Sequence, residues 1–132
     1  MSASPQDVFE KLLTSIVKQD HAAIPALYAD DVEVTQPMAQ PPLRMAGRDR
    51  LTEHFSGLTA NLPLTMTARD VVVHQTSDPE VIVAEWVYDV TVTATRKTFS
   101  TANVQIMRVR DGRIVESRDY HDHSAFAAAL QP

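Results

Sequence analysis

The hydrophobic pattern of this chain changes once, near Thr65, and this change limits the folds that are open to it. Before Thr65, apolar residues recur every three or four positions, the spacing of one helix face; after it, they alternate with polar residues, the spacing of a half-buried strand. Helices followed by strands predict an α+β fold, in which a curved antiparallel sheet wraps around the N-terminal helices as a cone-shaped barrel. We expect a single domain over residues 1–132, a length that can bury a core without metals or disulfides.

The first half of the chain predicts three helices. The first follows Ser4, a good cap before a proline and an early acidic residue. A shorter second helix is expected over 22–28, ahead of a short strand over 32–36, and a third helix over 48–61. Three prolines within 37–42 deny hydrogen bonds to a sheet and predict an extended loop at the rim of the molecule.

The second half predicts a four-stranded antiparallel meander and a short C-terminal helix capped by Ser124. The strands are expected over residues 66–75, 81–94, 98–110 and 113–121. Asp111-Gly112 reads as the tight turn of the last hairpin. In the second strand, alternate residues are uniformly apolar or aromatic, and we expect them to face the core and an internal cavity: Ile82, Ala84, Trp86, Tyr88, Val90 and Val92.

The last strand carries a dense set of ionisable groups. Strand alternation places four of its residues on one face: Val115, Ser117, Asp119 and His121. A carboxylate and an imidazole two residues apart on a concave face predict a proton-transfer site. A lining of Trp86, Tyr88 and Met107 would desolvate Asp119 and raise its pKa. The alternative interpretation of Asp119 is an ion pair or a solvated strand end.

The predicted cavity also contains groups that would orient a ligand. We expect its lining to include the following residues: Gln36, Met38, His54, Phe55, Trp86, Tyr88, Gln105 and Met107. Core packing alone would also explain the aromatic members of this set. His121 and His123 are spaced like a pair of metal ligands, with Asp119 or Asp122 as a possible third ligand. No other ligand clusters with them, so we predict no metal site.

Composition excludes several partners. Seventeen acidic and twelve basic residues give a net charge of −5, and no more than two basic residues are adjacent, so we expect no binding to nucleic acid. The chain has no cysteine, which removes disulfides and thiolate chemistry. Neither a signal-peptide pattern nor an apolar run of membrane-spanning length occurs, so we predict no membrane partner and a cytoplasmic location.

Three short motifs stand out: Ala29-Asp30-Asp31 before the first strand, Gly47-Arg48-Asp49 at a helix start and Gly112-Arg113-Ile114-Val115 in the last strand. Together they resemble the nuclear-transport-factor-2-like superfamily, whose fold is cystatin-like. The resemblance covers nearly the whole chain and is strongest to its SnoaL-like and ketosteroid-isomerase-like domains. It implies the cone-shaped fold, a homodimer formed through the exposed face of the sheet, an apolar small molecule as partner and no cofactor.

The catalytic sets of two relatives are incomplete here. Ketosteroid isomerases use a carboxylate base, a Tyr and a protonated Asp, and the matching positions resemble Gln36, Leu12 and Asn103. An amide cannot abstract a proton, so ordinary ketosteroid isomerisation is not expected. Of the water-positioning set of limonene-epoxide-hydrolase-like enzymes only Asp119 remains, which makes epoxide hydrolysis the less favoured alternative.

The resemblance to SnoaL-type polyketide cyclases points to Asp119 and His121, the nearest equivalents of the acidic residue and histidine of those enzymes. We therefore expect a cofactor-independent isomerase, cyclase or lyase acting on an apolar, carbonyl-bearing substrate. Asp119 would be the acid/base and His121 would tune it. Asn103, Tyr88 or Gln36 would stabilise the oxyanion. The alternative is a non-catalytic ligand-binding or accessory domain.

Overall fold

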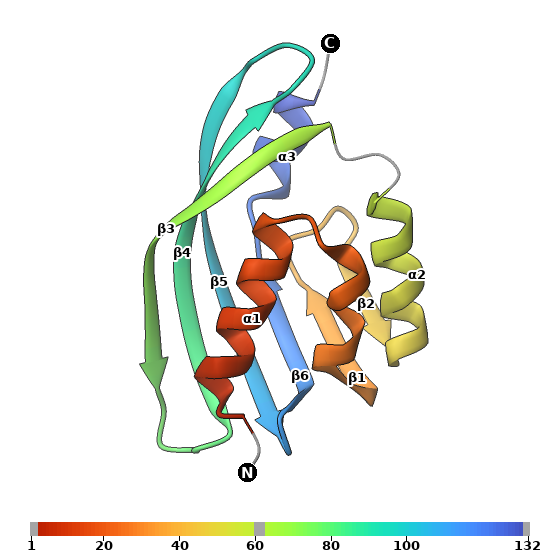
Figure 1. Cartoon of the computed structure of the whole chain (residues 1–132), viewed down its shortest axis with the longest axis vertical. Helices are drawn as coiled ribbons and strands as arrows, with labels where there is room; N and C mark the ends of the chain where they lie inside the picture. Colours follow the sequence, from red (N-terminus) through yellow and green to blue (C-terminus); the bar gives the residue numbers. More distant parts are fainter. Residues whose placement is uncertain (1–2, 60–62, 131–132) are drawn as a thin grey trace.

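The computed structural model describes residues 3–59 and 63–130, which form one six-stranded sheet with helices on its concave side (Figure 1). The strand order is β2-β1-β6-β5-β4-β3. The helical segments are α1 (Pro5–Val17), the short 3₁₀ helices η1 (His21–Ala23) and η2 (Pro25–Leu27), α2 (Arg48–Thr59) and α3 (His123–Ala129). The strands are β1 (Tyr28–Gln36), β2 (Leu43–Ala46), β3 (Leu64–Gln75), β4 (Val81–Val92), β5 (Thr98–Arg110) and β6 (Arg113–Tyr120).

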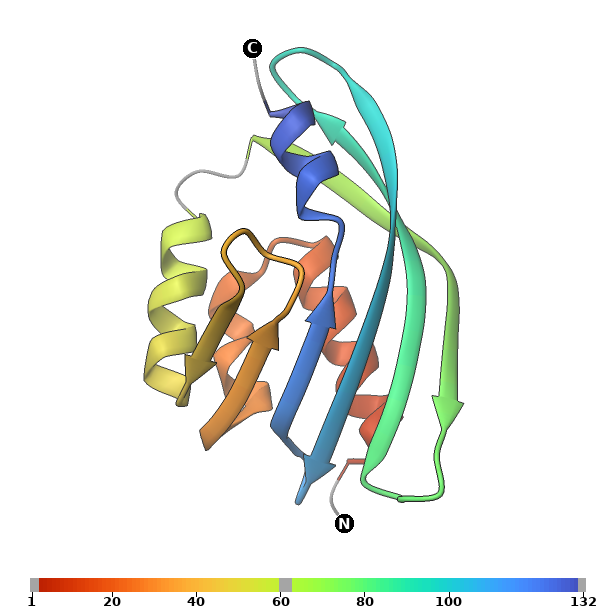
Figure 2. The same ribbon diagram turned by 180° about the vertical axis from the view of Figure 1, so that it is seen from behind.

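The α+β class and the curved sheet are confirmed, with two corrections to the predicted sheet. The sheet is open, because its order ends at β2 on one side and β3 on the other (Figure 2). It is also mixed, because β1 pairs in parallel with β6 while every other pair is antiparallel. Strand β2 was not predicted at all; its four residues lie between a proline-rich turn and a helix start, too few for a clear alternation.

Helix α1 lies across the concave face of the sheet (Figure 1) and buries Val8, Phe9 and Leu12 against it. The predicted cap is confirmed: the Ser4 side chain accepts from the backbone N–H of Asp7, and the Asp7 side chain accepts from the backbone N–H of Ser4. The alternating residues of β4, from Ile82 to Val92, are all buried as expected. No helix among the described residues is long and apolar enough to cross a membrane.

The predicted helix over 22–28 is wrong. Two 3₁₀ turns replace it, and Tyr28 is already the first residue of β1. Pro25 explains the break, because proline has no N–H to continue an α-helical hydrogen-bond series. The predicted cap of the last helix is also wrong, since the side chain of Asp122, not of Ser124, accepts from the N–H of Ala125. The third helix begins as expected after Gly47; the end predicted at residue 61 lies outside the described residues.

Two β-bulges bend the sheet around α1. In β3 the register to β4 shifts between Arg69 and Val72, where Asp70 has a positive φ of 55°. In β6 the register to β5 shifts at Val115, so Ile114 rather than Val115 shares the buried face with Ser117 and Asp119. The simple alternation predicted for this strand was therefore wrong at Val115. A bulge adds one residue on one strand and increases local bending and twist.

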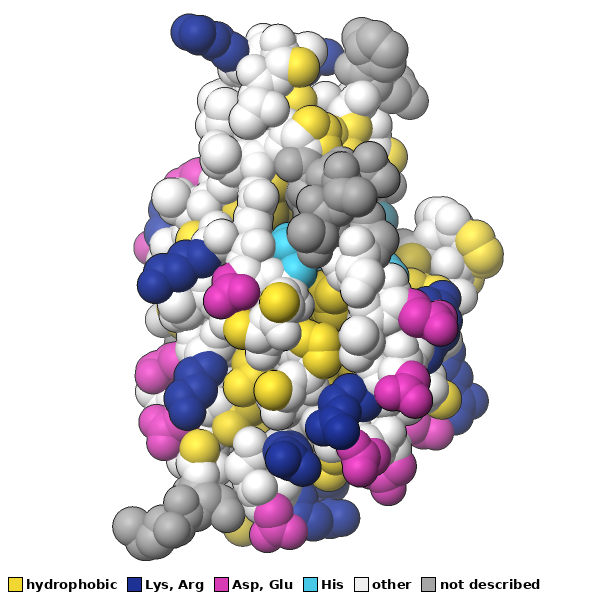
Figure 3. All heavy atoms as spheres, turned by 45° about the vertical axis from the view of Figure 1, so that its right-hand side comes forward, with side chains coloured by type: hydrophobic (Ala, Val, Ile, Leu, Met, Phe, Trp, Pro, Cys, Tyr) yellow, Lys and Arg dark blue, Asp and Glu magenta, His cyan; other side chains and the backbone are white. Residues whose placement is uncertain are grey.

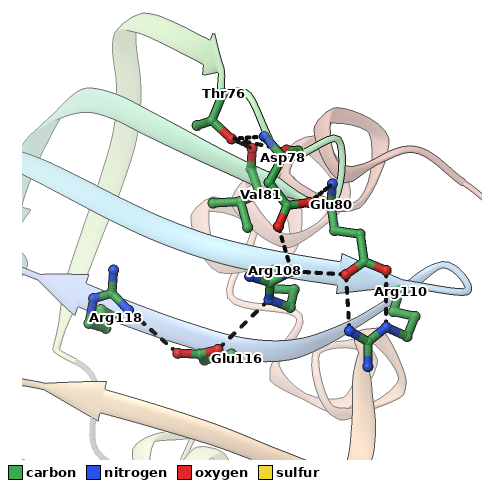
Figure 4. Close-up of polar contacts among 8 residues, drawn as sticks. All are labelled: Thr76, Asp78, Glu80, Val81, Arg108, Arg110, Glu116 and Arg118. Carbon is green, nitrogen blue, oxygen red and sulfur yellow. Dashed lines mark hydrogen bonds and ion pairs between the residues drawn. The ribbon is translucent and has the colours of Figure 1, made fainter.

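A network of ion pairs joins the β3–β4 turn to the neighbouring strands (Figure 4). Arg108 lies 2.8 Å from an Asp78 carboxylate oxygen and 2.9 Å from a Glu80 oxygen, and Arg110 makes two contacts of 3.0 Å with Glu80. These contacts link the β3–β4 turn to the C-terminal end of β5. The pKa of the Glu80 carboxyl is lowered to about 2, mainly because both arginines donate to it.

Candidate active site

The concave face of the sheet and the helices enclose a cavity of about 320 Å³. Its walls are mostly apolar and aromatic, and they come from α1, η1, β1, α2, β3, β4, β5, β6 and α3. Histidine atoms (cyan) are visible in a recess near the centre of the face in Figure 3, next to hydrophobic side chains (yellow). Four of the five histidines of the chain line the cavity: His21, His54, His121 and His123. None of the described lining residues is Lys or Arg.

The structure brings most of the proposed site residues into this cavity. Asp119 and His121 both line it. So do six of the residues proposed to bind substrate: Gln36, His54, Phe55, Trp86, Tyr88 and Gln105. Met38 instead is 56% exposed beside a separate surface hollow, and Met107 is enclosed in the core. Asn103 is buried on β5 and is not a lining residue, but its side chain contacts His121, which is one.

Asp119 is a buried carboxyl group held by a chain of hydrogen bonds. Its Oδ1 accepts from the Ser117 hydroxyl at 2.5 Å, and Ser117 Oγ in turn accepts from Gln105 Nε2 at 2.9 Å. Burial raises the pKa of Asp119 to about 6, and the hydrogen bonds from Ser117 and Gln105 moderate the rise. The carboxyl is thus mostly ionised at neutral pH, yet far more basic than an exposed aspartate.

His121 has a different partner from the one expected. Its Nδ1 lies 3.0 Å from Asn103 Oδ1, and Asn103 Nδ2 donates to the backbone oxygen of Thr101 at 3.2 Å. An amide oxygen only accepts, so Nδ1 carries the imidazole proton and Nε2 is left as an acceptor. Burial, together with His123, lowers the pKa of His121 to about 4. His121 is consequently a neutral hydrogen-bond acceptor whose tautomer Asn103 sets.

Two tyrosines in the cavity stay protonated. Burial raises the pKa of Tyr28 well above its ordinary value, and the charge of Asp119 adds to the rise. Burial also raises the pKa of Tyr88, whose ring packs edge-on against Trp86 with centroids 5.8 Å apart. A phenol that resists ionisation remains a hydrogen-bond donor. The cavity therefore combines a basic carboxylate with hydroxyl donors.

Sequence reasoning missed Tyr28, His21 and Ser117. Tyr28 was assigned to the end of a helix, and its position at the start of β1 follows only from the break at Pro25. Ser117 was placed on the correct face but received no role, although its hydroxyl donates to Asp119. His21 lies just before the helix predicted over 22–28 and was given no role; no pattern in the sequence marks it as a lining residue.

Among residues 3–59 and 63–130, no three His, Asp or Glu side chains are grouped so that they could hold an ion. His121 and His123, the potential pair, have ring centroids 5.8 Å apart, but the Nδ1 of His121 is used by Asn103.

Residues 9–117 match the family of SnoaL-like domains. The chain belongs to the SnoaL-like family. This match covers most of the chain and agrees with the resemblance found in its motifs. No functionally curated protein matches the chain.

Solved structures of the nuclear-transport-factor-2-like type share the fold of this SnoaL-like chain. A "putative isomerase" from Bacillus subtilis has a TM-score of 0.83 at 20% identity, covering 95% of this chain and 91% of its own. A "putative polyketide cyclase" from Xanthomonas campestris pv. campestris has a TM-score of 0.76 at 20% identity, with 96% of each chain covered. An LEH-like epoxide hydrolase from M. tuberculosis has a TM-score of 0.68 at 18% identity, covering 93% of this chain and 86% of its own. At these identities the similarity establishes the fold alone.

Proposed function

We propose that this protein is a cofactor-independent enzyme that removes a proton from the carbon next to a carbonyl group, with Asp119 as the general base. Such a step begins isomerisation, intramolecular aldol closure and elimination alike, which agrees with the isomerase and cyclase descriptions of the structural neighbours. The observation that carries the proposal is the buried Asp119 carboxyl at the wall of a largely apolar cavity, with its pKa raised to about 6.

The basicity of Asp119 suits this reaction. A base works best when its pKa lies near the working pH, because it is then both ionised and a strong proton acceptor. Ser117 holds one carboxylate oxygen by a hydrogen bond of 2.5 Å and so limits rotation of the side chain. The carboxyl can take the substrate proton and return it to another carbon, which balances the protons over an isomerisation.

Removing a proton next to a carbonyl leaves negative charge on the carbonyl oxygen. Tyr28 is well suited to stabilise that charge, because its hydroxyl stays protonated and lies in the same cavity as Asp119. Tyr88 is a second donor of the same kind. Asn103, which was expected in this role, is occupied with His121 and instead positions that ring.

The lining disfavours an anionic substrate. None of the described lining residues is Lys or Arg, and burial lowers the pKa of both His54 and His121, so no fixed cation would balance a carboxylate or phosphate on the ligand. An anionic ligand would also be repelled by ionised Asp119. The cavity volume of about 320 Å³ suits a molecule of one to a few rings.

Exchange of carbonyl-adjacent protons for deuterium tests the proposal without knowledge of the natural substrate. Neutral bicyclic ketones such as 2-tetralone would be incubated with the protein in deuterated buffer and followed by NMR. The wild-type protein should accelerate exchange, and Asp119→Asn should slow the enzymatic rate by about 10² to 10⁴. Binding, followed by quenching of Trp86, the one tryptophan, should persist in the variant.

Asp31→Asn is the matched control, because Asp31 is an exposed carboxylate on β1 outside the cavity lining. Its exchange rate should equal that of the wild type. Ketones that bind and quench Trp86 but show no Asp119-dependent exchange would favour the alternative function, a non-catalytic domain that binds neutral small molecules.

A further inference from the structure

His121 presents one ring nitrogen that the protein leaves accessible. Its Nδ1 contacts Asn103, and its Nε2 has no hydrogen-bond partner among the residues that the structure describes. Both ring nitrogens of His21 and the Nε2 of His123 are buried without a partner, whereas the Nε2 of His121 is not closed off in this way. Through Nε2, His121 can therefore bind a ligand without any rearrangement of the protein.

The ring of His121 lies on the concave side of the sheet. His121 directly follows β6, two residues after Asp119, so the two side chains leave the extended chain on the same side. The ring packs edge-on against Trp86, with centroids 6.5 Å apart, and all three residues line the cavity. Nδ1 is next to the ring carbon that carries the rest of the side chain, whereas Nε2 is at the far end of the ring. The accessible nitrogen is thus on the part of the ring that points away from the sheet.

Asn103 decides which nitrogen of His121 carries the proton. Asn103 Nδ2 donates to the backbone oxygen of Thr101 at 3.2 Å, and turning the amide over would place two acceptors against each other there. The contact with Thr101 therefore directs Asn103 Oδ1 at His121 Nδ1, 3.0 Å away. Nδ1 donates, and Nε2 keeps its lone pair.

A lone pair at Nε2 needs a hydrogen-bond donor from the ligand. The smallest neutral group that adds a donor to a ring ketone is a hydroxyl. Two residues of extended chain span about 6.6 Å, so a ligand with its carbonyl at Asp119 would reach His121 from a neighbouring ring. Asp119 is buried, whereas His121 is half-buried and also borders the surface hollow beside Met38. The hydroxyl would thus lie nearer the outside than the carbonyl.

We infer that His121 is a specificity-determining residue whose Nε2 accepts a hydrogen bond from a hydroxyl group of the substrate, and that Asn103 is the positioning residue that holds the accepting tautomer. The preferred substrate is then a ring ketone with a hydroxyl on the ring that does not carry the carbonyl. This inference rests on the proposed function for the position of the carbonyl at Asp119.

Three sets of matched ketones test the inference: 2-tetralone, its isomers with one hydroxyl on the aromatic ring, and the same isomers with fluorine in place of the hydroxyl. Fluorine is close to a hydroxyl in size but cannot donate. At least one hydroxy ketone should bind the wild type about tenfold more tightly than its fluoro counterpart, the effect of one good hydrogen bond. His121→Phe should reduce this preference to less than threefold. Calorimetry is the readout, because His121 contacts Trp86 and its replacement would alter the fluorescence.

Nitrogen NMR of the wild-type protein tests the same contact directly. The two ring nitrogens of a histidine give separate ¹⁵N signals, which distinguish the protonated nitrogen from the other. In the free protein, His121 should carry its proton on Nδ1, and the hydroxy ketone, but not the fluoro ketone, should shift the Nε2 signal. Asn103→Leu removes the acceptor of Nδ1, so the signals should report a mixture of tautomers and the hydroxyl preference should fall below threefold.

His74→Phe is the control, because His74 is an exposed histidine on β3 outside the cavity lining, and it should keep the wild-type preference. His121→Leu replaces His121→Phe if the latter does not fold, and NMR of the wild type needs no variant. Equal binding of hydroxy and fluoro ketones by the wild type, a preference that survives in His121→Phe, or a proton found on Nε2 would each overturn the inference.

Failure of the proposed function gives a different result. If Asp119→Asn exchanged protons as fast as the wild type while the hydroxyl preference still depended on His121, the base assignment would be wrong and the recognition role of His121 would stand. If exchange depended on Asp119 but no hydroxyl preference existed, only the inference about His121 would fall.

Discussion

At the residue scale, burial of Asp119 makes the site basic at a cost in stability. The folded-state pKa is raised from 3.8 to about 6, so the folded protein favours the protonated form. The contribution of this group to stability is therefore fully present below pH 3.8 and is lost as the pH rises through 6. Asp119→Asn, which keeps an acceptor for Ser117, should increase the free energy of unfolding by about 2 to 3 kcal/mol at pH 7. Urea denaturation at pH 7 and pH 4 should show this gain only at pH 7.

Ser117 offers a second test at the same scale. Its hydrogen bond favours the ionised form of Asp119, so Ser117→Ala should raise the pKa of the carboxyl further. The pH at which proton exchange reaches half its plateau should move upward by a measurable fraction of a unit, while binding of a neutral ketone changes little. A profile that stays at the wild-type position would show that Ser117 does not set the basicity.

At the element scale, the ion pairs of the β3–β4 turn should matter most near neutral pH. Arg110 and Arg108 hold the pKa of Glu80 at about 2, below its usual 4.5. The contribution of this carboxylate to the stability of the folded protein is therefore present above pH 4.5 and is lost as the pH falls to 2. Glu80→Gln should lower the urea midpoint at pH 7, and the difference should vanish near pH 2. Glu53→Gln, at an exposed position of α2, is the control and should leave the midpoint unchanged at both pH values.

Regular elements were predictable from the sequence, but the departures from regularity were not. Alternation in β4 and capping at Ser4 were correct because each depends on neighbours along the chain. The bulge at Val115 and the strand β2 depend on pairing with distant segments, so no local pattern reveals them. Among the site residues, Asp119 could be assigned to the buried face of β6, because the bulge at Val115 precedes it and the alternation is regular from Ser117 onward. Tyr28 could not, because the break at Pro25 decided its surroundings.

At the scale of the whole molecule, the open curved sheet explains how a chain of this size holds a cavity. Bulges in β3 and β6 curve the sheet, α1 covers only part of its concave side, and the remaining space is lined by residues from nine elements. Family resemblance located the carboxylate but did not predict the Asn103–His121 pair, which arises from contacts between β5 and the segment after β6.

The homodimer remains a prediction at this scale. The outer face of the sheet carries partly exposed apolar residues on its central strands, including Val87, Val104 and Ile106. Sedimentation equilibrium should give twice the mass of the chain, and Val104→Glu should shift the protein toward the monomer by placing a charge in the apolar contact. A wild-type protein that sediments as a monomer at all concentrations would contradict the prediction.

The central claim is that a buried Asp119 acts as the base, and the pH dependence of ketone proton exchange tests it most directly. The rate for the wild-type protein should rise with pH and level off with an apparent pKa of about 6, the value that burial gives this carboxyl. Asp119→Asn should abolish both the rate and its inflection. An inflection near 4, the value of an exposed aspartate, or a profile unchanged in Asp119→Asn, would contradict the account.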